Sequence, residues 1–339
     1  MSAARAVQSV YTAHPNCKVR QLSLPRLDIV IVNWNSGAQL CACLRSVAAA
    51  SRAAHALDRV VVVDNGSTDG SADLPDALGL PLTVIRNEAN RGFAAACNRG
   101  AAGSGAGYLL FLNPDARLAA DALDTAVAFL EDPAHATIGI CGVRLVDERG
   151  ATHRSCTLHP APRHFVAKMV GLDRLAPRLF PSHVMTEWDH AEDREVDHVM
   201  GAVFLVRRSL FERLGGFDER FFVYLEDLDL TLRAKQAGFG TVFLSRASAF
   251  HKGGGVSEQV KPARLYYSLH SRMRYGRKHF PPVVAWGLAA GTLLVEPVAR
   301  AAGAVATGRW GEIGTTVRGF ARLWRAALTG RGPVETAGR

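Results

Sequence analysis

The sequence of 339 residues has few cysteines and no dense cluster of them. Its six cysteines include a C-x-C pair at Cys41 and Cys43 but show neither the spacing of a metal site nor that of a disulfide framework. We therefore expect reduced thiols, as in a cytoplasmic protein. The first 26 residues lack the apolar core of a secretory signal, and we interpret residues 1–25 as a flexible leader.

Signatures of nucleic-acid binding are also missing, although the formal net charge is +9. There is no zinc-finger spacing, no RNP aromatic motif and no long Lys/Arg block, so we predict no nucleic-acid partner. The excess of positive charge favours other anions, such as anionic lipid or a diphosphate substrate. Neither a P-loop nor a G-x-G-x-x-G motif is present, which leaves ATPase and dinucleotide-binding functions without their main support.

What the sequence does contain, from about 26 to 145, is a regular alternation of strand-like and helix-like segments. The strand-like runs are apolar throughout, which is typical of strands buried on both faces. The alternation predicts an α/β fold with a mostly parallel sheet and helices on both faces. The expected strands are 29–32, 60–63, 82–85, 108–112 and 138–143.

Polar residues follow the first four of these strands. They are Asn33 and Asn35, then Asp64, then Asn87 to Asn90, then Asn113 and Asp115. Because ligands bind at the carboxyl ends of parallel strands, the repetition predicts a site at this edge of the sheet. A simple turn is the alternative at each single position. Ser36 is expected to cap the helix that follows the first strand.

The chain beyond 145 is less regular. Residues 147–195 are interpreted as a lid or an acceptor-binding loop. A strand is expected at 201–207 and a helix from about Glu226 to Gly238. Asp229 and Arg233, four residues apart, are expected to pair on the surface of that helix.

Three acidic clusters and one histidine have the chemistry of a site. Asp64 can accept hydrogen bonds from a nucleobase or ribose. Asp115 can hold Mg²⁺ or Mn²⁺ together with a diphosphate, and His251 can add a metal ligand. The adjacent pair Glu226-Asp227 can supply a general base and a supporting acid. Each has an ordinary explanation in isolation, as a turn or as the start of a helix.

The last part of the chain, from about 262, is basic and aromatic. Residues 313–328 combine Arg with Phe, Leu and Trp in the pattern of a basic amphipathic helix, which can lie on an anionic membrane surface. Residues 283–295 are apolar but too short to span a bilayer, and Glu296 and Arg300 are expected to interrupt any extension. Packing on the catalytic domain or a dimer contact is the alternative, and the oligomeric state stays open.

Read in order, the motifs between about 28 and 257 resemble the family 2 glycosyltransferases of GT-A (Rossmann-like) fold, and within them the bacterial rhamnosyltransferases. They are IVIVNWNSGAQLCACLRSV, VVVVDNGSTDGSADL, NRGFAAACNRG, YLLFLNPDARL, GAVFLVRRSLFERLGGFDERFFVYLEDLDLTLRAKQAGF and AFHKGGGVS. The resemblance implies a catalytic domain at 26–260, with a nucleotide-sugar half at 26–145 and an acceptor and catalytic half at 146–260. A basic amphipathic helical tail would occupy 261–339.

The resemblance also implies roles for individual residues. Asp227 would be the catalytic base, supported by Glu226, and Asp115 with His251 would bind a divalent metal, Mg or Mn. Asn113 replaces the first acid of the family's D-x-D motif, which weakens the expectation of strict metal dependence. Gly201 and Ala202 would lie on the acceptor side. The donor-binding residues would be Asn33, Asn35, Asp64, Asn90, Gly92, Asn98, Asn113 and Asp115.

The implied reaction is an inverting sugar transfer from a nucleotide-diphosphate sugar, with dTDP-L-rhamnose the favoured donor. The implied acceptor is a lipid-linked or polysaccharide glycan at the cytoplasmic face of the cell membrane, which the tail would contact peripherally. A UDP-sugar such as UDP-galactofuranose is the alternative donor. A nucleotidyltransferase usually has a Gly-rich signature with Arg and Lys near the first strand, where this chain has Asn-Trp-Asn-Ser-Gly. An inactive membrane scaffold is opposed by the intact Glu226-Asp227 and Asp115.

Overall fold

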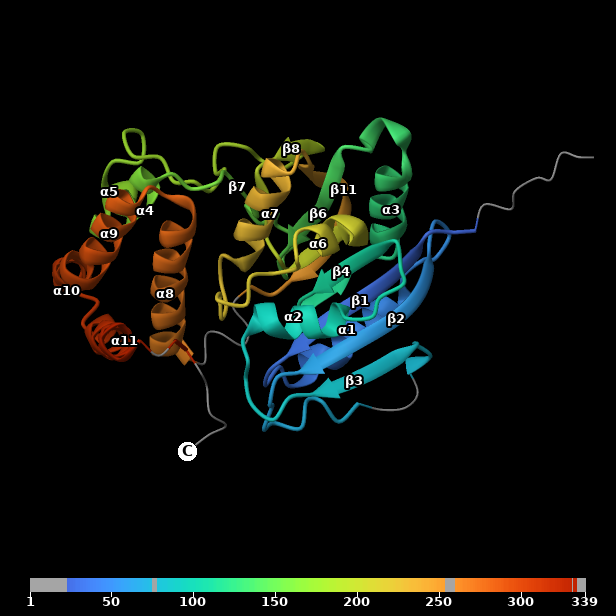
Figure 1. The fold of residues 1–339 in the computed structure, drawn as a ribbon, viewed down its shortest axis with the longest axis horizontal. Helices are drawn as coiled ribbons and strands as arrows, with labels where there is room; N and C mark the ends of the chain where they lie inside the picture. The colour runs from blue at the N-terminus through green and yellow to red at the C-terminus, as the bar shows by residue number, and fades with distance from the viewer. Residues whose placement is uncertain (1–22, 75–77, 254–259, 331, 334–339) are drawn as a thin grey trace, which may run out of the picture.

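The computed structural model describes residues 23–74, 78–253, 260–330 and 332–333. These residues form an α/β body with a group of helices packed beside it (Figure 1). The leader predicted at 1–25 falls almost wholly outside the described residues, as do Gly254 and Gly255 of the last motif.

Nine strands of the described chain form one sheet, in the order β3-β2-β1-β4-β10-β6-β11-β5 with β8 beside β11. Strands β3, β2, β1 and β4 run parallel, whereas β10 is antiparallel to both of its neighbours. The predicted α/β fold with a mostly parallel sheet is therefore confirmed. The strands are β1 (Arg26–Asn33), β2 (Ala56–Asp64), β3 (Leu82–Arg86), β4 (Tyr108–Leu112), β5 (Ala116–Leu118), β6 (Ile138–Val146), β8 (Arg194–Val196), β10 (Val203–Arg207) and β11 (Gly240–His251).

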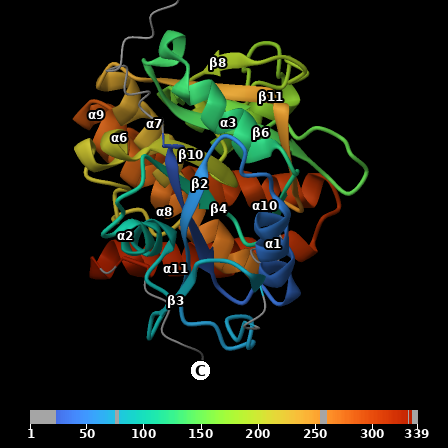
Figure 2. The same ribbon diagram turned by 90° about the vertical axis from the view of Figure 1, so that its right-hand side faces the viewer.

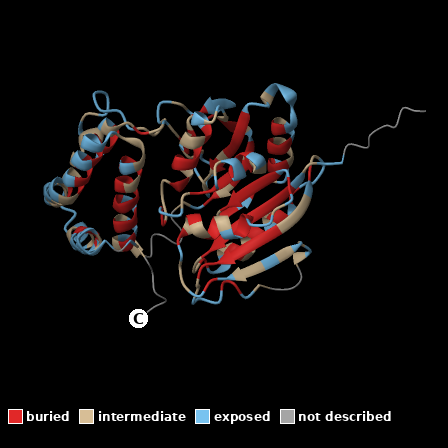
Figure 3. Ribbon diagram, in the orientation of Figure 1, coloured by how far each residue is buried: buried red, intermediate tan, exposed pale blue. Residues whose placement is uncertain are grey.

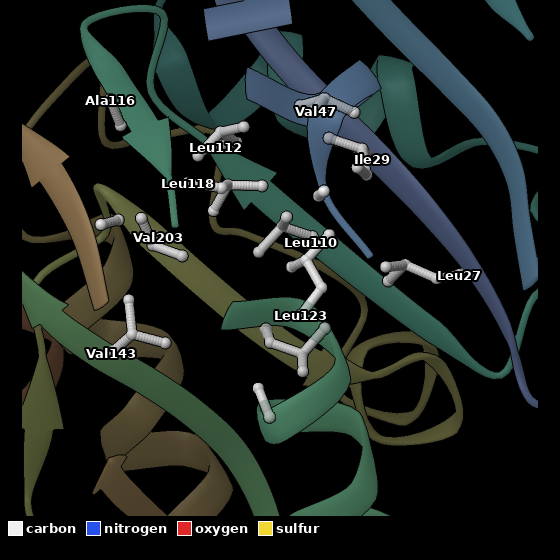
Figure 4. Close-up of a cluster of buried hydrophobic side chains, with 14 of the residues drawn as sticks. Leu27, Ile29, Val47, Leu110, Leu112, Ala116, Leu118, Leu123, Val143 and Val203 are labelled. Atoms are coloured by element: carbon white, nitrogen blue, oxygen red, sulfur yellow. The ribbon is translucent and has the colours of Figure 1, made fainter. Parts of the chain in front are cut away.

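Successive residues of a strand point to opposite faces of the sheet, so the apolar strands carry apolar side chains on both faces. Helices cover each face. Ile29 and Ile31 pack with α1 (Ala38–Ala49) and α3 (Ala122–Glu131) on one face, in the cluster shown in Figure 4. Val30 and Val32 pack on the other face against α2 (Phe93–Ala101), α6 (Arg208–Arg213) and α7 (Glu226–Gln236). Figure 2 shows α1 and α2 on opposite sides of β1 and β2.

One local prediction is wrong, and one stretch is more regular than its sequence indicates. Ser36 does not cap α1: its hydroxyl donates to Asn33 Oδ1, and Gly37 occupies the N-cap position without a side-chain hydrogen bond. The irregular stretch 147–195 contains two helices, α4 (Pro162–Val170) and α5 (Leu172–Leu175), and a strand β7 (Cys156–Thr157) that pairs with β9 (His198–Val199). Of these, α4 packs against the C-terminal helices, so its apolar face depends on residues far away in sequence.

The helices beside the body are called here the helical unit, comprising residues 162–180 and 261–329. The unit contains α4, α5, α8 (Lys261–His279), α9 (Pro282–Ala290), a π-helical turn (Gly291–Val295), α10 (Glu296–Ala306) and α11 (Gly311–Thr329). Leu269 and Met273 of α8 pack on Phe320 and Leu323 of α11, which gives the unit an apolar core of its own. The helical C-terminal tail expected from the sequence is thus present.

The prediction that Glu296 and Arg300 interrupt the apolar segment is wrong. The helix continues from Pro282 to Ala306 and is the one helix of the described chain that is long and apolar enough to cross a membrane, by length and composition alone. Glu296 is fully buried, and its carboxylate accepts hydrogen bonds from Arg272 of α8 and from Arg300 Nε at 2.9 Å. The charge is accommodated because Arg272 is buried with it and the partly exposed Arg300 adds a second positive charge.

The expected surface pair of Asp229 and Arg233 is also buried. Arg233 Nε donates to Asp229 Oδ2 at 2.7 Å, and the Asp229 side chain is fully inaccessible. The other oxygen, Oδ1, lies 2.7 Å from Lys278 Nζ and 2.8 Å from His279 Nε2. Asp229 therefore joins α7 of the body to α8 of the helical unit.

Candidate active site

A cavity of about 690 Å³ opens between the carboxyl ends of the parallel strands, the start of α7 and the helical unit. Its wall includes Trp34 after β1, Asn65 after β2, and Arg264 and Tyr267 of α8. Nine of the residues predicted from the sequence line it: Asn90, Gly92, Asn113, Asp115, Gly201, Ala202, Glu226, Asp227 and His251. The sheet edge thus gathers most of the predicted site into one space.

Three other predicted residues, Asn33, Asn35 and Asp64, do not line this cavity. Asn33 and Asp64 are buried, and the Asn33 amide donates to Asp64 Oδ1 at 2.9 Å. Asn35 adopts a positive φ of 49°, and its Oδ1 accepts the backbone N–H of Thr68 at 2.8 Å. These side chains hold the β1 and β2 ends together, and their predicted contact with the donor remains a prediction.

Asn98 also lies outside the cavity wall. Its Oδ1 accepts the backbone N–H of Phe217 at 2.9 Å, and its amide donates to the Phe217 carbonyl at 2.8 Å. Asn98 therefore fixes the turn at Gly215-Gly216-Phe217, which precedes the segment leading into α7. Its predicted role in donor binding is not tested by these contacts.

Asn65, which the sequence analysis did not single out, connects two loops of the cavity wall. Its amide donates to Asn90 Oδ1 at 2.8 Å and to the Gly92 carbonyl at 3.1 Å. Gly92 has a φ of 90°, and a Cβ there would lie 2.5 Å from the carbonyl oxygen of Phe222. Only glycine fits that approach. The position of Asn65 directly after Asp64 was the available sequence signal.

Asp115 and His251 meet on one side of the cavity. His251 Nε2 lies 3.3 Å from Asp115 Oδ1, and both side chains are about nine-tenths buried. His251 Nδ1 is buried without a hydrogen-bond partner. The described residues contain no group of three or more His, Cys, Asp and Glu side chains that could hold a metal alone. One carboxylate and one imidazole fit a divalent cation whose remaining ligands are substrate oxygens and water.

Asp227 lies at the start of α7 with its carboxylate surrounded by N–H groups. Its Oδ2 accepts the backbone N–H of Gly201 at 2.9 Å, and its Oδ1 accepts that of Leu228 at 2.8 Å. A Cβ at Gly201 would lie 2.9 Å from Asp227 Oδ2, so glycine permits this close approach. Both carboxylate oxygens are thus held in place by backbone N–H groups.

Glu226, the adjacent residue, has the opposite environment. Only 5 % of Glu226 is exposed, and its Oε2 has no hydrogen-bond partner among the described residues. Burial, together with the negative charges of Asp227 and Asp229, raises the pKa of Glu226 well above its usual value. Two neighbouring carboxyl groups in such different surroundings are suited to different roles, one as a base and one as a neutral acid.

The backbone just before this pair is strained. Tyr224 and Leu225 have positive φ values of 70° and 66°, which are unusual for residues with a side chain. Leu225 is the N-cap of α7, so the unusual backbone sets the direction in which Glu226 and Asp227 leave the loop. Strained residues held by their surroundings are common at functional sites.

Several histidines of the cavity were not found by sequence reasoning. They are His153, His183 and His198, which come from the irregular stretch and from strand β9. Burial, with smaller effects from Lys168, His164 and His198, lowers the pKa of His183 to about 4. No motif marks these residues, because their proximity to α7 depends on how the stretch folds.

The comparison with protein families gives one match to the chain. The family described as "Glycosyl transferase family 2" matches residues 28–215. The matched range includes the ends of β1, β2 and β4, Asp115 and Gly201, but stops before α7.

Curated proteins and solved structures give further similarities. The chain is 29 % identical over 242 residues to an N-acetylglucosaminyl-diphospho-decaprenol L-rhamnosyltransferase of Mycobacterium tuberculosis, covering 66 % of this chain and 75 % of that protein. It is 31 % identical over 170 residues to the rhamnosyltransferase WbbL of Escherichia coli, covering 50 % and 61 %.

Among solved structures, the fold is similar to that of the mannosyltransferase PcManGT from Pyrobaculum calidifontis in complex with GDP-Man and Mn²⁺. The TM-score is 0.51 at 21 % identity, and the similarity covers 92 % of this chain and 78 % of that chain. At this identity the similarity concerns the fold alone, and it agrees with the GT-A fold expected from the sequence.

Proposed function

The chain belongs to glycosyl transferase family 2, and we propose that it transfers L-rhamnose from dTDP-L-rhamnose to a hydroxyl group of a lipid-linked or polysaccharide glycan, with inversion at the anomeric carbon. The observation that carries the proposal is the cavity itself. It brings Asp115, after β4, into the same space as Asp227, at the start of α7. One end suits a diphosphate and the other a hydroxyl that must lose its proton.

The mechanism assigns the proton transfer to Asp227. Its carboxylate takes the proton of the acceptor hydroxyl as that oxygen attacks the anomeric carbon, and the bond to the nucleotide diphosphate breaks with its electron pair on the diphosphate. The backbone N–H groups of Gly201 and Leu228 donate hydrogen bonds to the carboxylate and fix its orientation without transferring a proton to it. Glu226, kept neutral by burial, supports the site without acting as a second base.

The diphosphate end of the site is assigned to Asp115, Asn113 and His251. A divalent Mg²⁺ or Mn²⁺ bound there would neutralise the charge that develops on the departing diphosphate. Asp115 and His251 would hold it, and the Asn113 amide oxygen is an additional neutral ligand. Because only one of these groups is an acid, we expect weaker metal binding than at a site with two aspartates.

The remaining donor residues are proposed from their position around the same space. Asn90 and Gly92 line the cavity beside Asn65, on the nucleotide side of the sheet. We assign 26–145 to nucleotide-sugar binding and 146–260 to the acceptor and the base, with Gly201 and Ala202 on the acceptor side. Asn33, Asn35, Asp64 and Asn98 are proposed to act indirectly, by fixing the loops that carry these residues.

The sugar and acceptor are proposed from the names of the relatives. The Mycobacterium tuberculosis protein is named as an L-rhamnosyltransferase acting on a diphospho-decaprenol-linked sugar. A lipid-linked acceptor is consistent with the surface of the helical unit, which carries 15 of the 18 exposed large apolar side chains of the described residues. Figure 3 shows this exposure along the outer helices. We propose that this surface contacts the cytoplasmic face of the membrane peripherally.

The test is a donor screen followed by a transfer assay. In thermal-shift measurements with Mn²⁺, dTDP-L-rhamnose should raise Tm more than UDP-galactofuranose, GDP-mannose or dTDP alone. With N-acetylglucosaminyl-diphospho-decaprenol present, the enzyme should release dTDP and form a rhamnosylated lipid. Preferential stabilisation and transfer with UDP-galactofuranose would replace the donor but keep the reaction class. Release of inorganic diphosphate with a nucleotide attached to the product would overturn the proposal in favour of a nucleotidyltransferase.

A further inference from the structure

His198 lies behind Asp227 and faces it from strand β9. It lines the cavity and is 5 % exposed. Its Nε2 is 3.7 Å from Asp227 Oδ2, and its Nδ1 is 3.5 Å from Thr231 Oγ1, one turn further along α7. Because residues four apart lie on one side of a helix, a single imidazole faces both groups.

His198 faces the Thr231 hydroxyl with one ring nitrogen and the Asp227 carboxylate with the other. The Thr231 hydroxyl donates to the Leu228 carbonyl at 3.1 Å, so its oxygen is left to accept. His159 Nε2 lies 3.2 Å from that oxygen, closer than His198 Nδ1 at 3.5 Å. A hydroxyl oxygen has two lone pairs, so it can accept from both imidazoles and does not by itself fix the His198 tautomer. The negative charge of Asp227 favours the proton of a neutral His198 on Nε2, the nitrogen that faces the carboxylate.

His198 is neutral in this environment. Burial lowers its pKa, against the opposite effect of the Asp227 and Asp197 carboxylates. The other titratable groups that face it, His159 and His183, are themselves neutral, because burial lowers the pKa of each to about 4. Lys235 lies on the far side of Asp197, to which its ammonium donates at 2.6 Å. The influence of His198 on Asp227 is therefore that of an N–H dipole.

We propose that His198 is a positioning residue for Asp227, which it keeps ionised and oriented towards the acceptor hydroxyl. Its Nε2–H complements the backbone N–H groups of Gly201 and Leu228, so three elements, β9, the 200–202 turn and α7, hold one carboxylate. The inference rests on the proposed function, because it needs Asp227 to be the base. It assigns a role to a residue for which the sequence gave no motif.

The first test is the pH dependence of kcat/KM, measured as dTDP release from dTDP-L-rhamnose with N-acetylglucosaminyl-diphospho-decaprenol. In His198→Leu the carboxylate loses the N–H dipole that faces it at 3.7 Å, so the acid limb should move up by about one pH unit. His198→Gln keeps an amide N–H and should restore at least half of that shift. KM for dTDP-L-rhamnose should stay within about twofold in both variants, since His198 acts through Asp227.

The matched control is His55→Leu. His55 is also a buried histidine paired with an aspartate, with Nδ1 2.8 Å from Asp124 Oδ1, but it does not line the cavity. That variant should lower Tm and leave the acid limb where it is. If His198→Leu lowers the rate with an unmoved acid limb, as a packing role would, the inference is wrong. If Asp227→Asn retains normal turnover, the proposed base is wrong instead.

The second test needs no substrate. The titration midpoint of the His198 imidazole is followed by two-dimensional NMR of ¹⁵N-histidine-labelled protein, with His198→Gln identifying the signal. Since the Asp227 carboxylate raises the pKa of His198, Asp227→Asn should move the midpoint to lower pH. An unchanged midpoint would show that the two side chains are not coupled, and would overturn the inference whatever the donor sugar is.

Discussion

The body and the helical unit differ in how far their large apolar side chains are exposed to solvent. In the body, the strands and the helices on both faces bury theirs, and among its large apolar residues that the structure describes only Leu24, Leu158 and Met200 are exposed. The helical unit leaves 15 such side chains in contact with solvent, including three tryptophans, although it buries charged Arg272 and Glu296 inside. Exposed apolar surfaces of this kind mark sites of contact with a partner or a membrane, and this one is the surface for which we propose the membrane contact.

The site lies where these two regions meet. Phe222 of the body packs on Tyr267 of α8 with ring centroids 4.8 Å apart, and both residues line the cavity. The Ser271 hydroxyl of α8 donates to the Val223 carbonyl at 2.7 Å, next to the strained residues that lead into α7. The helical unit therefore completes one wall of the cavity and also supports the segment that presents Asp227.

The largest expected effect separates the two carboxyl groups at this junction. Asp227→Asn should lower kcat by about 10³-fold because it removes the base. Glu226→Gln should keep at least a third of wild-type kcat, since a neutral amide replaces a carboxyl group that is already neutral. Both are measured as dTDP release under saturating substrate. A larger loss in Glu226→Gln than in Asp227→Asn would reverse the assignment of the two residues.

The next effect concerns the attachment of the helical unit to the body. Asp229→Asn should lower the free energy of unfolding by about 3 kcal/mol, because Arg233 and Lys278 would lose the charge that they share in a buried position. Chemical denaturation with urea measures it. The control is Glu212→Gln, which removes an exposed i,i+4 pair with Arg208 and should change stability by less than about 0.5 kcal/mol. Equal effects would mean that Asp229 does not link the two regions.

The body was largely predictable from the sequence, and the helical unit was not. Buried parallel strands produce continuous apolar runs such as Val60–Val63, and the chain ends each run with polar residues at the edge where ligands bind. Glu296 was misread because its partner Arg272 lies on another helix, and a charge without a visible partner looks like an interruption. Whether an ion pair is buried depends on tertiary packing, which the hydrophobic periodicity of the sequence does not indicate.

The site shows the same division at the level of single residues. Asp115 and Asp227 line the cavity as expected, because the end of a strand and the start of a helix have fixed positions in this fold. Asn33 and Asn35 also follow a strand, yet the Asn33 amide donates to Asp64 and the Asn35 side chain accepts from the backbone of Thr68. A sequence shows that a polar group lies at the sheet edge, but not whether its partner is a ligand or a neighbouring loop.

A third prediction tests the outer surface of the helical unit. Trp286 and Leu294 are 69 % and 71 % exposed on the continuous helix of residues 282–306. Replacing both with Ser should weaken binding to vesicles of anionic phospholipid by at least about tenfold, since two large apolar side chains no longer enter the interface. The control pair, Leu24→Ser and Leu158→Ser, lies on the body and should change vesicle binding by less than twofold. Sedimentation with vesicles would contradict the membrane contact if the wild type and the two double variants bind equally.

The smallest expected effect is a difference in acid sensitivity between the two regions. In the helical unit, burial lowers the pKa of His270 to about 4, so between about pH 6.5 and pH 4 the unfolded chain binds a proton that the folded chain does not. Stability from this group therefore falls as pH is lowered through that window. In the body, hydrogen bonds from Ser51, Ala53 and Ala54 outweigh burial and lower the pKa of Asp124 to about 2. The contribution of Asp124 to stability is therefore lost only as pH falls from about 4 towards 2.

A histidine variant in each region isolates this difference. His270→Gln removes the group that must stay neutral when folded, so the loss of Tm between pH 6.5 and pH 4.5 should shrink by a few degrees relative to the wild type. His135→Gln makes the same replacement at a half-buried histidine of the body and controls for the substitution itself. Differential scanning fluorimetry across this range measures both slopes. Equal slopes for His270→Gln and the wild type would mean that α8 opens to water near His270 before the chain unfolds, and that the helical unit is less firmly packed than its buried core indicates.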